Sequence, residues 1–218
     1  MKATYFAVGA AAILTLITAG CGSSSHEASA VSQQKIQAEE PAAPPISAES
    51  DTFCQEGLAA YSRFEYDAAI AAYNKALRAD SHNYQALSGK GVALAMRGNA
   101  SGNTEDVTAG IASIQQALAI WPNYVQAFYD LALAYKINGQ YDESITYFQK
   151  VLNADPKNTW SYYGIATIYG DKSDAVNAVA YLKKAAALDK EHVLEAARTQ
   201  SHFDSIRQDP AFQALVNP

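Results

Sequence analysis

Residues 141–156 read YDESITYFQKVLNADP, and a close copy, YDAAIAAYNKALRAD, occupies residues 66–80. The two stretches align without gaps, and their apolar residues recur at the spacing of one helix face. Two further copies follow the same pattern: VTAGIASIQQALAIWP begins at residue 107, and AVNAVAYLKKAAALD begins at residue 175. Four copies of one helical pattern predict a repeat protein.

A second helical stretch precedes each copy, and both stretches carry small residues at fixed positions. Small side chains let two helices approach closely, while large apolar side chains fill the space beside the contact. One helix pair cannot bury its apolar face alone, whereas stacked pairs bury a continuous core. The sequence therefore predicts an all-α protein of stacked helix pairs. The small residues of the first stretches are Gly57, Gly91, Ala132 and Ala166. In the copies, the large apolar residue is Tyr73, Ile114, Phe148 or Leu182. The smaller residues on either side of it are Ala69 and Ala76, Gly110 and Ala117, Ser144 and Val151, and Ala178 and Ala185.

The spacing of these residues resembles the tetratricopeptide repeat, a helix–turn–helix unit of 34 residues. The resemblance covers residues 51–192 and implies a right-handed superhelix of helix pairs. It also implies a scaffold that binds other proteins and is not an enzyme, because repeats and tail leave no segment for a catalytic domain. Four repeats are expected, at residues 50–83, 84–124, 125–158 and 159–192.

The C-terminal residues 193–218 do not continue the repeat. Apolar residues recur in this tail at helical spacing, and Asp209 followed by Pro210 is a typical helix start. The last repeat of a solenoid exposes an apolar face that a terminal helix must cover. We therefore predict capping helices that cover the second helix of repeat 4. Their apolar residues are Phe203, Ile206, Phe212 and Leu215.

Repeat 2 is longer than its neighbours, and the excess falls at residues 100–106, between its two helices. The stretch SGN predicts a loop there, with Asn103 or Thr104 capping the next helix. The insertion is interpreted either as a tolerated surface loop or as a contact loop for a partner. Gly98 and Gly139 are expected to end the first helices of repeats 2 and 3 in the left-handed conformation.

Residues 1–20 are similar to the signal peptide of a bacterial lipoprotein. Lys2 supplies a positive charge, an uncharged apolar run follows, and the sequence TAGC, which resembles a lipobox, ends at Cys21. The resemblance implies that Cys21 is acylated on its sulfur and becomes the N-terminus, so that the attached lipid binds the membrane. An uncleaved anchor and an ordinary secretory signal are the alternatives, and both also place the domain outside the cytoplasm.

Residues 21–50 contain serine, proline, alanine and glutamine but little that could be buried. This composition predicts a disordered tether. The expected localisation is that of an exported bacterial lipoprotein, on the periplasmic side of the envelope or the outer face of the plasma membrane.

The composition argues against several classes of function. The formal net charge is −6, whereas nucleic-acid binding requires a basic patch. The four histidines are scattered and form no metal motif, so no metal, cofactor or catalytic residue is expected. Cys54 lies in an apolar helical stretch and is interpreted as a small hydrophobic residue or, alternatively, as a reactive thiol.

The resemblance places the functional surface on the concave side of the solenoid, which the first helices line. The predicted lining is aromatic and aliphatic, and Lys136 is its only basic residue. It indicates an apolar or amphipathic peptide segment as ligand, although these side chains could instead pack against the tail or a neighbouring helix. The candidate groove residues are Leu58, Tyr61, Val92, Met96, Tyr129, Leu133, Lys136, Trp160 and Tyr163.

The leading hypothesis is an envelope-tethered adaptor that recruits a partner protein, expected to be another envelope protein, through this groove. A pilotin-like lipoprotein that assists secretin or pilus assembly is the alternative within the same class. A module that binds peptidoglycan or another glycan is the alternative of a different class, because Trp160 and nearby tyrosines could stack on sugars.

Overall fold

The computed structural model describes residues 42–217, which contain α-helices, one 3₁₀ helix and no strand. This arrangement confirms the predicted all-α fold class. The predicted signal peptide, Cys21 and the tether up to residue 41 lie outside the described residues. No helix within the described range has the length and apolar character needed to cross a bilayer.

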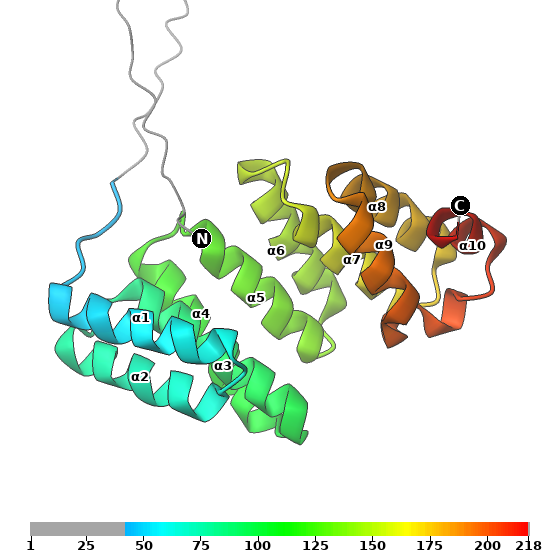
Figure 1. Ribbon diagram of the computed structural model, residues 1–218. Coiled ribbons are helices and arrows are strands. Elements are labelled where there is room, and N and C mark those ends of the chain that lie inside the picture. The colour runs from blue at the N-terminus through cyan, green and yellow to red at the C-terminus, as the bar shows by residue number, and fades with distance from the viewer. Residues whose placement is uncertain (1–41, 218) are drawn as a thin grey trace, which may run out of the picture. The chain divides into compact units, whose positions relative to one another are not determined.

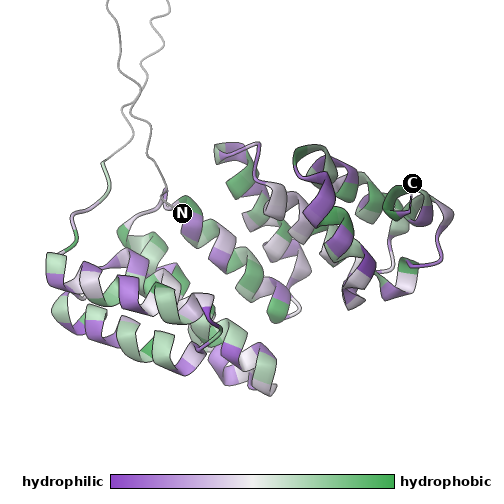
Figure 2. Ribbon diagram, in the orientation of Figure 1, coloured by the Kyte–Doolittle hydropathy of each residue, from purple (hydrophilic) through white to green (hydrophobic). Residues whose placement is uncertain are grey.

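Eight helices form four consecutive pairs, and each pair packs against the next along the chain (Figure 1). The first helices of successive pairs also contact one another, so they form one continuous face of the stack. Hydrophobic and hydrophilic residues are mixed along the helices, as helices buried on one side require (Figure 2). The pairs are α1 (Ala48–Ser62) with α2 (Tyr66–Ala79), α3 (Tyr84–Ser101) with α4 (Thr104–Ile120), α5 (Val125–Ile137) with α6 (Tyr141–Ala154), and α7 (Thr159–Asp171) with α8 (Ala175–Leu188).

Glycine permits the closest contact between paired helices. A Cβ atom on Gly91 of α3 would lie 2.6 Å from the backbone oxygen of Gly110 in α4, and one on Gly110 would lie 2.5 Å from that of Gly91. Backbone therefore touches backbone, and no larger residue fits at either position. Elsewhere a ring fills the space beside a glycine: Tyr73 packs against Gly57 within the first pair, and Phe148 of α6 packs against Gly164 of α7, between the third and fourth pairs.

The residues predicted to form the helix contacts are buried in every pair. The four large residues of the second helices, such as Phe148 and Ile114, expose 2% of their surface or less. The small residues around them are also buried. Burial of a large side chain beside two small ones therefore repeats four times along the chain, as the sequence pattern predicts.

The extra residues of repeat 2 lengthen both of its helices instead of forming a loop. Helix α3 continues to Ser101, and α4 begins at Thr104 with Asn103 as its N-cap, as predicted. The predicted left-handed end at Gly98 is wrong, because Gly98 is helical and packs closely against Asn103. The left-handed residue is Gly102, with φ +72°.

The turn inside each of the other pairs also contains a residue with positive φ. Gly139 adopts φ +74°, as predicted, and Phe64 and Ser173 occupy the corresponding turns of repeats 1 and 4 with φ 62° and 60°. A bulky residue is unfavourable in this conformation. The turn of repeat 1 is therefore locally strained, and Phe64 is also 76% exposed.

One carboxylate is buried between the first helices of repeats 2 and 3. Asp130 of α5 is 5% exposed, and it accepts hydrogen bonds from Ser88 of α3 at 2.7 Å and Gln126 at 2.8 Å. Burial raises the pKa of Asp130 to about 6, although both hydrogen bonds act in the opposite direction. The ionised form is therefore disfavoured in the folded protein.

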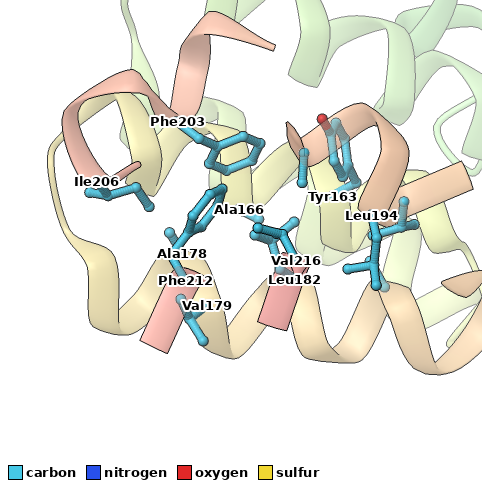
Figure 3. Close-up of a cluster of buried hydrophobic side chains, with 13 residues drawn as sticks. Tyr163, Ala166, Ala178, Val179, Leu182, Leu194, Phe203, Ile206, Phe212 and Val216 are labelled. Carbon is cyan, nitrogen blue, oxygen red and sulfur yellow. The ribbon is translucent and has the colours of Figure 1, made fainter. Parts of the chain in front are cut away.

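The C-terminal tail forms α9 (Lys190–Thr199), the 3₁₀ helix η1 (Ser201–Ile206) and α10 (Pro210–Val216). Helices α9 and α10 pack against α8, as predicted, but η1 packs against α7, the first helix of repeat 4. Phe203 of η1 is fully buried, and its ring meets those of Tyr163 and Phe212 (Figure 3). The tail therefore also reaches the face formed by the first helices, where Tyr163 packs against it, as the alternative interpretation of the groove residues allows.

Deleting the chain from Ser201 onward should expose the cluster around Phe203 and Phe212. Each lost large core side chain costs about 3–5 kcal/mol, so the free energy of unfolding should fall by several kcal/mol and aggregation should increase. Urea unfolding of the truncated and full-length proteins measures the change. A chain that ends at Val216 is the control, and equal stability of all three proteins would show that the tail is a loose extension.

Asp130→Asn should flatten the pH dependence of stability. An aspartate has a pKa of about 3.9 in the unfolded chain, so the folded protein binds the Asp130 proton more tightly and loses stability as pH rises from about 4 to about 6. The variant lacks this loss and should be more stable than wild type above pH ~6, by on the order of 2 kcal/mol.

Urea unfolding at several pH values between about 4 and 7 measures the slope of the free energy of unfolding against pH. Asp142→Asn, at a side chain that is 89% exposed, is the control and should keep the wild-type slope. A slope of wild-type size in Asp130→Asn would mean that Asp130 is not the titrating group.

Candidate functional site

A cavity of about 540 Å³ lies on the face formed by the first helices. Its walls come from α3, α5 and α7, from the start of α6, and from the tail. The cavity contains six of the nine residues predicted to line the groove. These are Met96, Tyr129, Leu133, Lys136, Trp160 and Tyr163.

The other three predicted groove residues do not line this cavity. Val92 is 6% exposed and belongs to the packed interior, while Leu58 of α1 is 54% exposed and Tyr61 is partly buried. The cavity is thus built from repeats 2 to 4 and the tail, without repeat 1. A partner-binding role of all nine residues remains a prediction.

Two aromatic side chains occupy the centre of the site. Tyr129 and Trp160 line the main cavity and also an adjoining cavity of about 240 Å³. Tyr129 packs edge-on against Phe148, with ring centroids 5.6 Å apart, and Trp160 packs edge-on against Tyr163 at the same distance. Trp160 nevertheless remains 44% exposed. A large aromatic surface held in place by neighbouring rings but open to solvent is typical of an interface anchor.

A polar network forms one end of the main cavity. The Lys136 ammonium donates to Thr167 Oγ1 at 2.6 Å and lies 3.1 Å from His202 Nε2. His202 Nδ1 lies 2.8 Å from Asp171 Oδ1. Burial lowers the pKa of Lys136 to about 8, and Asp171 partly offsets this effect. Lys136 is therefore mostly charged at neutral pH, in surroundings that exclude much of the water.

Sequence reasoning missed the contribution of the tail to this site. Gln200 and His202 line the cavity, whereas the tail was interpreted as a cap or, alternatively, as a segment that packs against the groove residues. His202 lies 66 positions after Lys136 in the chain, and no local pattern indicates which face η1 covers.

Neither a metal-binding cluster nor an exposed cysteine is found in the part of the chain that the structure describes. Within residues 42–217, no three His, Cys, Asp or Glu side chains are placed to hold a metal ion. Cys54 is 6% exposed, and burial, with a smaller effect of Asp51, raises the pKa of its thiol to about 11. The thiolate required for reactivity is thus strongly disfavoured, and the interpretation of Cys54 as a small hydrophobic residue is favoured.

Solved structures with the same helix-pair architecture resemble the described domain. MamA is 25% identical in sequence, with a TM-score of 0.53 over 66% of this chain and 80% of that chain. TTC0263 of Thermus thermophilus is 16% identical, with a TM-score of 0.59 over 77% of this chain and 86% of that chain. MamA of Desulfovibrio magneticus is 17% identical, with a TM-score of 0.53 over 78% of this chain and 95% of that chain.

Family models identify the repeats directly in the sequence. Three tetratricopeptide-repeat models match residues 54–103, 125–158 and 161–192, which together make up more than half of the chain. No curated protein matches the sequence significantly. From the repeat matches and the stacked helix pairs, we conclude that the chain belongs to the tetratricopeptide-repeat family.

Proposed function

We propose that this protein is a non-catalytic adaptor that binds a segment of a partner protein in the cavity between α3, α5, α7 and the tail. The observation that carries the proposal is the pair Tyr129 and Trp160, which borders two adjoining cavities on the continuous face of the first helices. A stack of helix pairs with such a face is suited to extended ligands.

The character of the lining indicates the chemistry of the ligand. Met96, Leu133 and the aromatic rings supply apolar surface, and Lys136 is the basic residue of the cavity. An apolar or amphipathic segment would therefore be held mainly by burial of its side chains. Because burial is little affected by counterions, the affinity should depend only weakly on salt concentration.

The proposal includes attachment to a membrane through Cys21. Its support is the sequence of residues 1–21, in which an apolar run ends in small residues before the cysteine. A lipid at the end of a tether would confine the adaptor to the membrane surface while leaving its domain free to search for a partner, most simply another envelope protein.

Trp160→Ala should weaken partner binding by roughly 1–3 kcal/mol, because a central aromatic side chain commonly dominates such an interface. Because the Trp160 side chain is 44% exposed, its replacement by alanine should leave the fold intact. Leu188→Ala, at an apolar residue that is 42% exposed and does not line the cavity, is the matched control and should bind like wild type. Circular dichroism measures folding, and calorimetry with the partner segment measures affinity.

Tyr129→Ala should weaken binding over the same range, but it should also lower stability, since Tyr129 packs against Phe148. If the double variant Trp160→Ala, Tyr129→Ala were well folded and bound with full affinity, the partner would dock elsewhere.

Cys21→Ala should abolish acylation and block processing of the lipoprotein type, because the thiol that carries the lipid is lost. Intact-protein mass spectrometry of membrane fractions should show a lipid-modified N-terminal cysteine in the wild type. Cys54→Ala is the matched cysteine control and should leave the modification unchanged. An unmodified Cys21 in the mature wild-type protein would exclude the lipid anchor.

A further inference from the structure

The turn between α1 and α2 holds a phenylalanine whose conformation and exposure both cost free energy. Phe64 adopts φ 62° and is 76% exposed, so it combines a strained left-handed backbone with an apolar ring in water. The turns of repeats 2 and 3 place glycine in this conformation, and the turn of repeat 4 places Ser173 there. An exposed ring that is held at a strained position indicates a contact outside the fold of the single chain.

Phe64 belongs to an apolar patch on the first helix pair. Its ring meets that of Tyr66 edge-on, with centroids 6.5 Å apart, and the centroids of Tyr66 and Tyr61 are 6.0 Å apart. Leu58 lies one helical turn before Tyr61 on the same side of α1, and it is 54% exposed. We call these four side chains the repeat-1 patch. Large apolar side chains that gather at an exposed surface are typical of a protein–protein contact.

The repeat-1 patch lies on the helix pair at the opposite end of the stack from the tail (Figure 1). The tail covers the last pair, α7 with α8. In contrast, α1 is the first helix of the described chain, so no described helix precedes it to cover the first pair. Because the end pair of a solenoid needs a cover for its apolar surface, the first pair still has apolar surface to bury.

The charges beside the patch suit a second copy of the same chain. Arg63 and Glu65 flank Phe64, and Arg63 donates two hydrogen bonds to the Glu65 carboxylate, at 3.0 and 2.8 Å. Each copy therefore presents one positive and one negative group beside the ring. When two such surfaces meet around a two-fold axis, Arg63 of one copy faces Glu65 of the other. The net charge of −6 per chain opposes this contact little, because salt screens distant charges beyond about 8 Å.

We propose that two copies of this chain associate through their repeat-1 patches, with the two Phe64 rings at the centre of an isologous contact. Each ring packs against the aromatic side chains of the other copy, and Arg63 pairs with Glu65 across the border. The patch is small beside the roughly 20–30 residues that each partner contributes to a stable complex. The dimer is therefore weak, with a Kd in the micromolar range or above.

This contact is separate from the cavity of repeats 2 to 4, because none of the four patch residues lines that cavity. A dimer would thus present two cavities at once, which increases the avidity for a partner that offers two segments. Confinement of the chains to one membrane would also raise their local concentration and favour a weak dimer. Both consequences rest on the proposed function, whereas self-association does not.

Sedimentation equilibrium of the full-length chain, in a concentration series up to about 1 mM, measures this association. We expect the wild type to pass from monomer to dimer along the series. Phe64→Gly should raise the Kd of the dimer roughly tenfold or more, because it removes the central ring from both copies. The melting temperature should not fall, since glycine adopts positive φ without strain.

Two further variants make this comparison specific to the ring. Phe64→Asn should weaken the dimer as Phe64→Gly does, because asparagine also tolerates the left-handed conformation. Ser173→Gly is the matched control: it places glycine at the corresponding turn of repeat 4, outside the patch. This control should dimerise like the wild type.

A mixing experiment tests the two-fold arrangement. Arg63→Glu alone should weaken the dimer, because two acids then face each other across the border, and Glu65→Arg alone should weaken it through two facing cations. In an equimolar mixture of the two variants, each mixed dimer again pairs opposite charges. The mixture should therefore associate more strongly than either variant alone.

A wild type that stays monomeric over the whole series would overturn the proposal and leave the repeat-1 patch to a different protein. Dimerisation of Phe64→Gly and Phe64→Asn with the wild-type Kd would overturn it as well, because the contact would then lie elsewhere. A mixture of the charge variants that associates no better than either variant alone would overturn the two-fold contact.

Discussion

The close approach of two helix backbones sets the geometry on which the rest of this molecule depends. Gly91 and Gly110 bring α3 and α4 into direct contact, Tyr73 packs against Gly57 within the first pair, and Phe148 packs against Gly164 between the third and fourth pairs. Because such contacts hold helices close together both within and between pairs, successive pairs stack and their first helices meet. The cavity wall depends on this stacking, because its side chains come from first helices that are not adjacent in sequence and meet only in the stack.

The ends of the stack explain why the site lies where it does. A terminal repeat must cover its apolar face, and here the tail does so with α9 and α10 on α8 and with η1 on α7. The last of these contacts places His202 beside Lys136 and adds tail residues to the cavity. Covering the end of the stack and completing the binding surface are therefore performed by one segment.

The helix pairs could be predicted from sequence because their contacts are local and repeated. The pattern of small and large residues identified each buried contact, including Phe148 and Leu182, without knowledge of the structure. The ends of the longer helices could not be obtained in this way, because a stretch such as SGN favours a loop but does not forbid one more helical turn. Gly98 shows the same ambiguity, since glycine serves both left-handed turns and close contacts.

The candidate site was predictable only where it depends on the repeat. Trp160 and Tyr129 follow from their positions in the first helices, and both line the cavity. Val92 occupies the position in repeat 2 that Leu133 occupies in repeat 3, but Leu133 lines the cavity and Val92 is buried, because burial depends on which neighbours surround a side chain. The network of Lys136, His202 and Asp171 joins segments far apart in the chain and required the three-dimensional structure.

The central claim is that a partner protein docks in the cavity. Its most direct test is photo-crosslinking in intact cells, with a photoreactive amino acid placed at Trp160 or, on the second helix of the same repeat, at Leu188. The account predicts a discrete crosslinked partner from position 160 and none from position 188. A partner captured from position 188 but not from position 160 would contradict it.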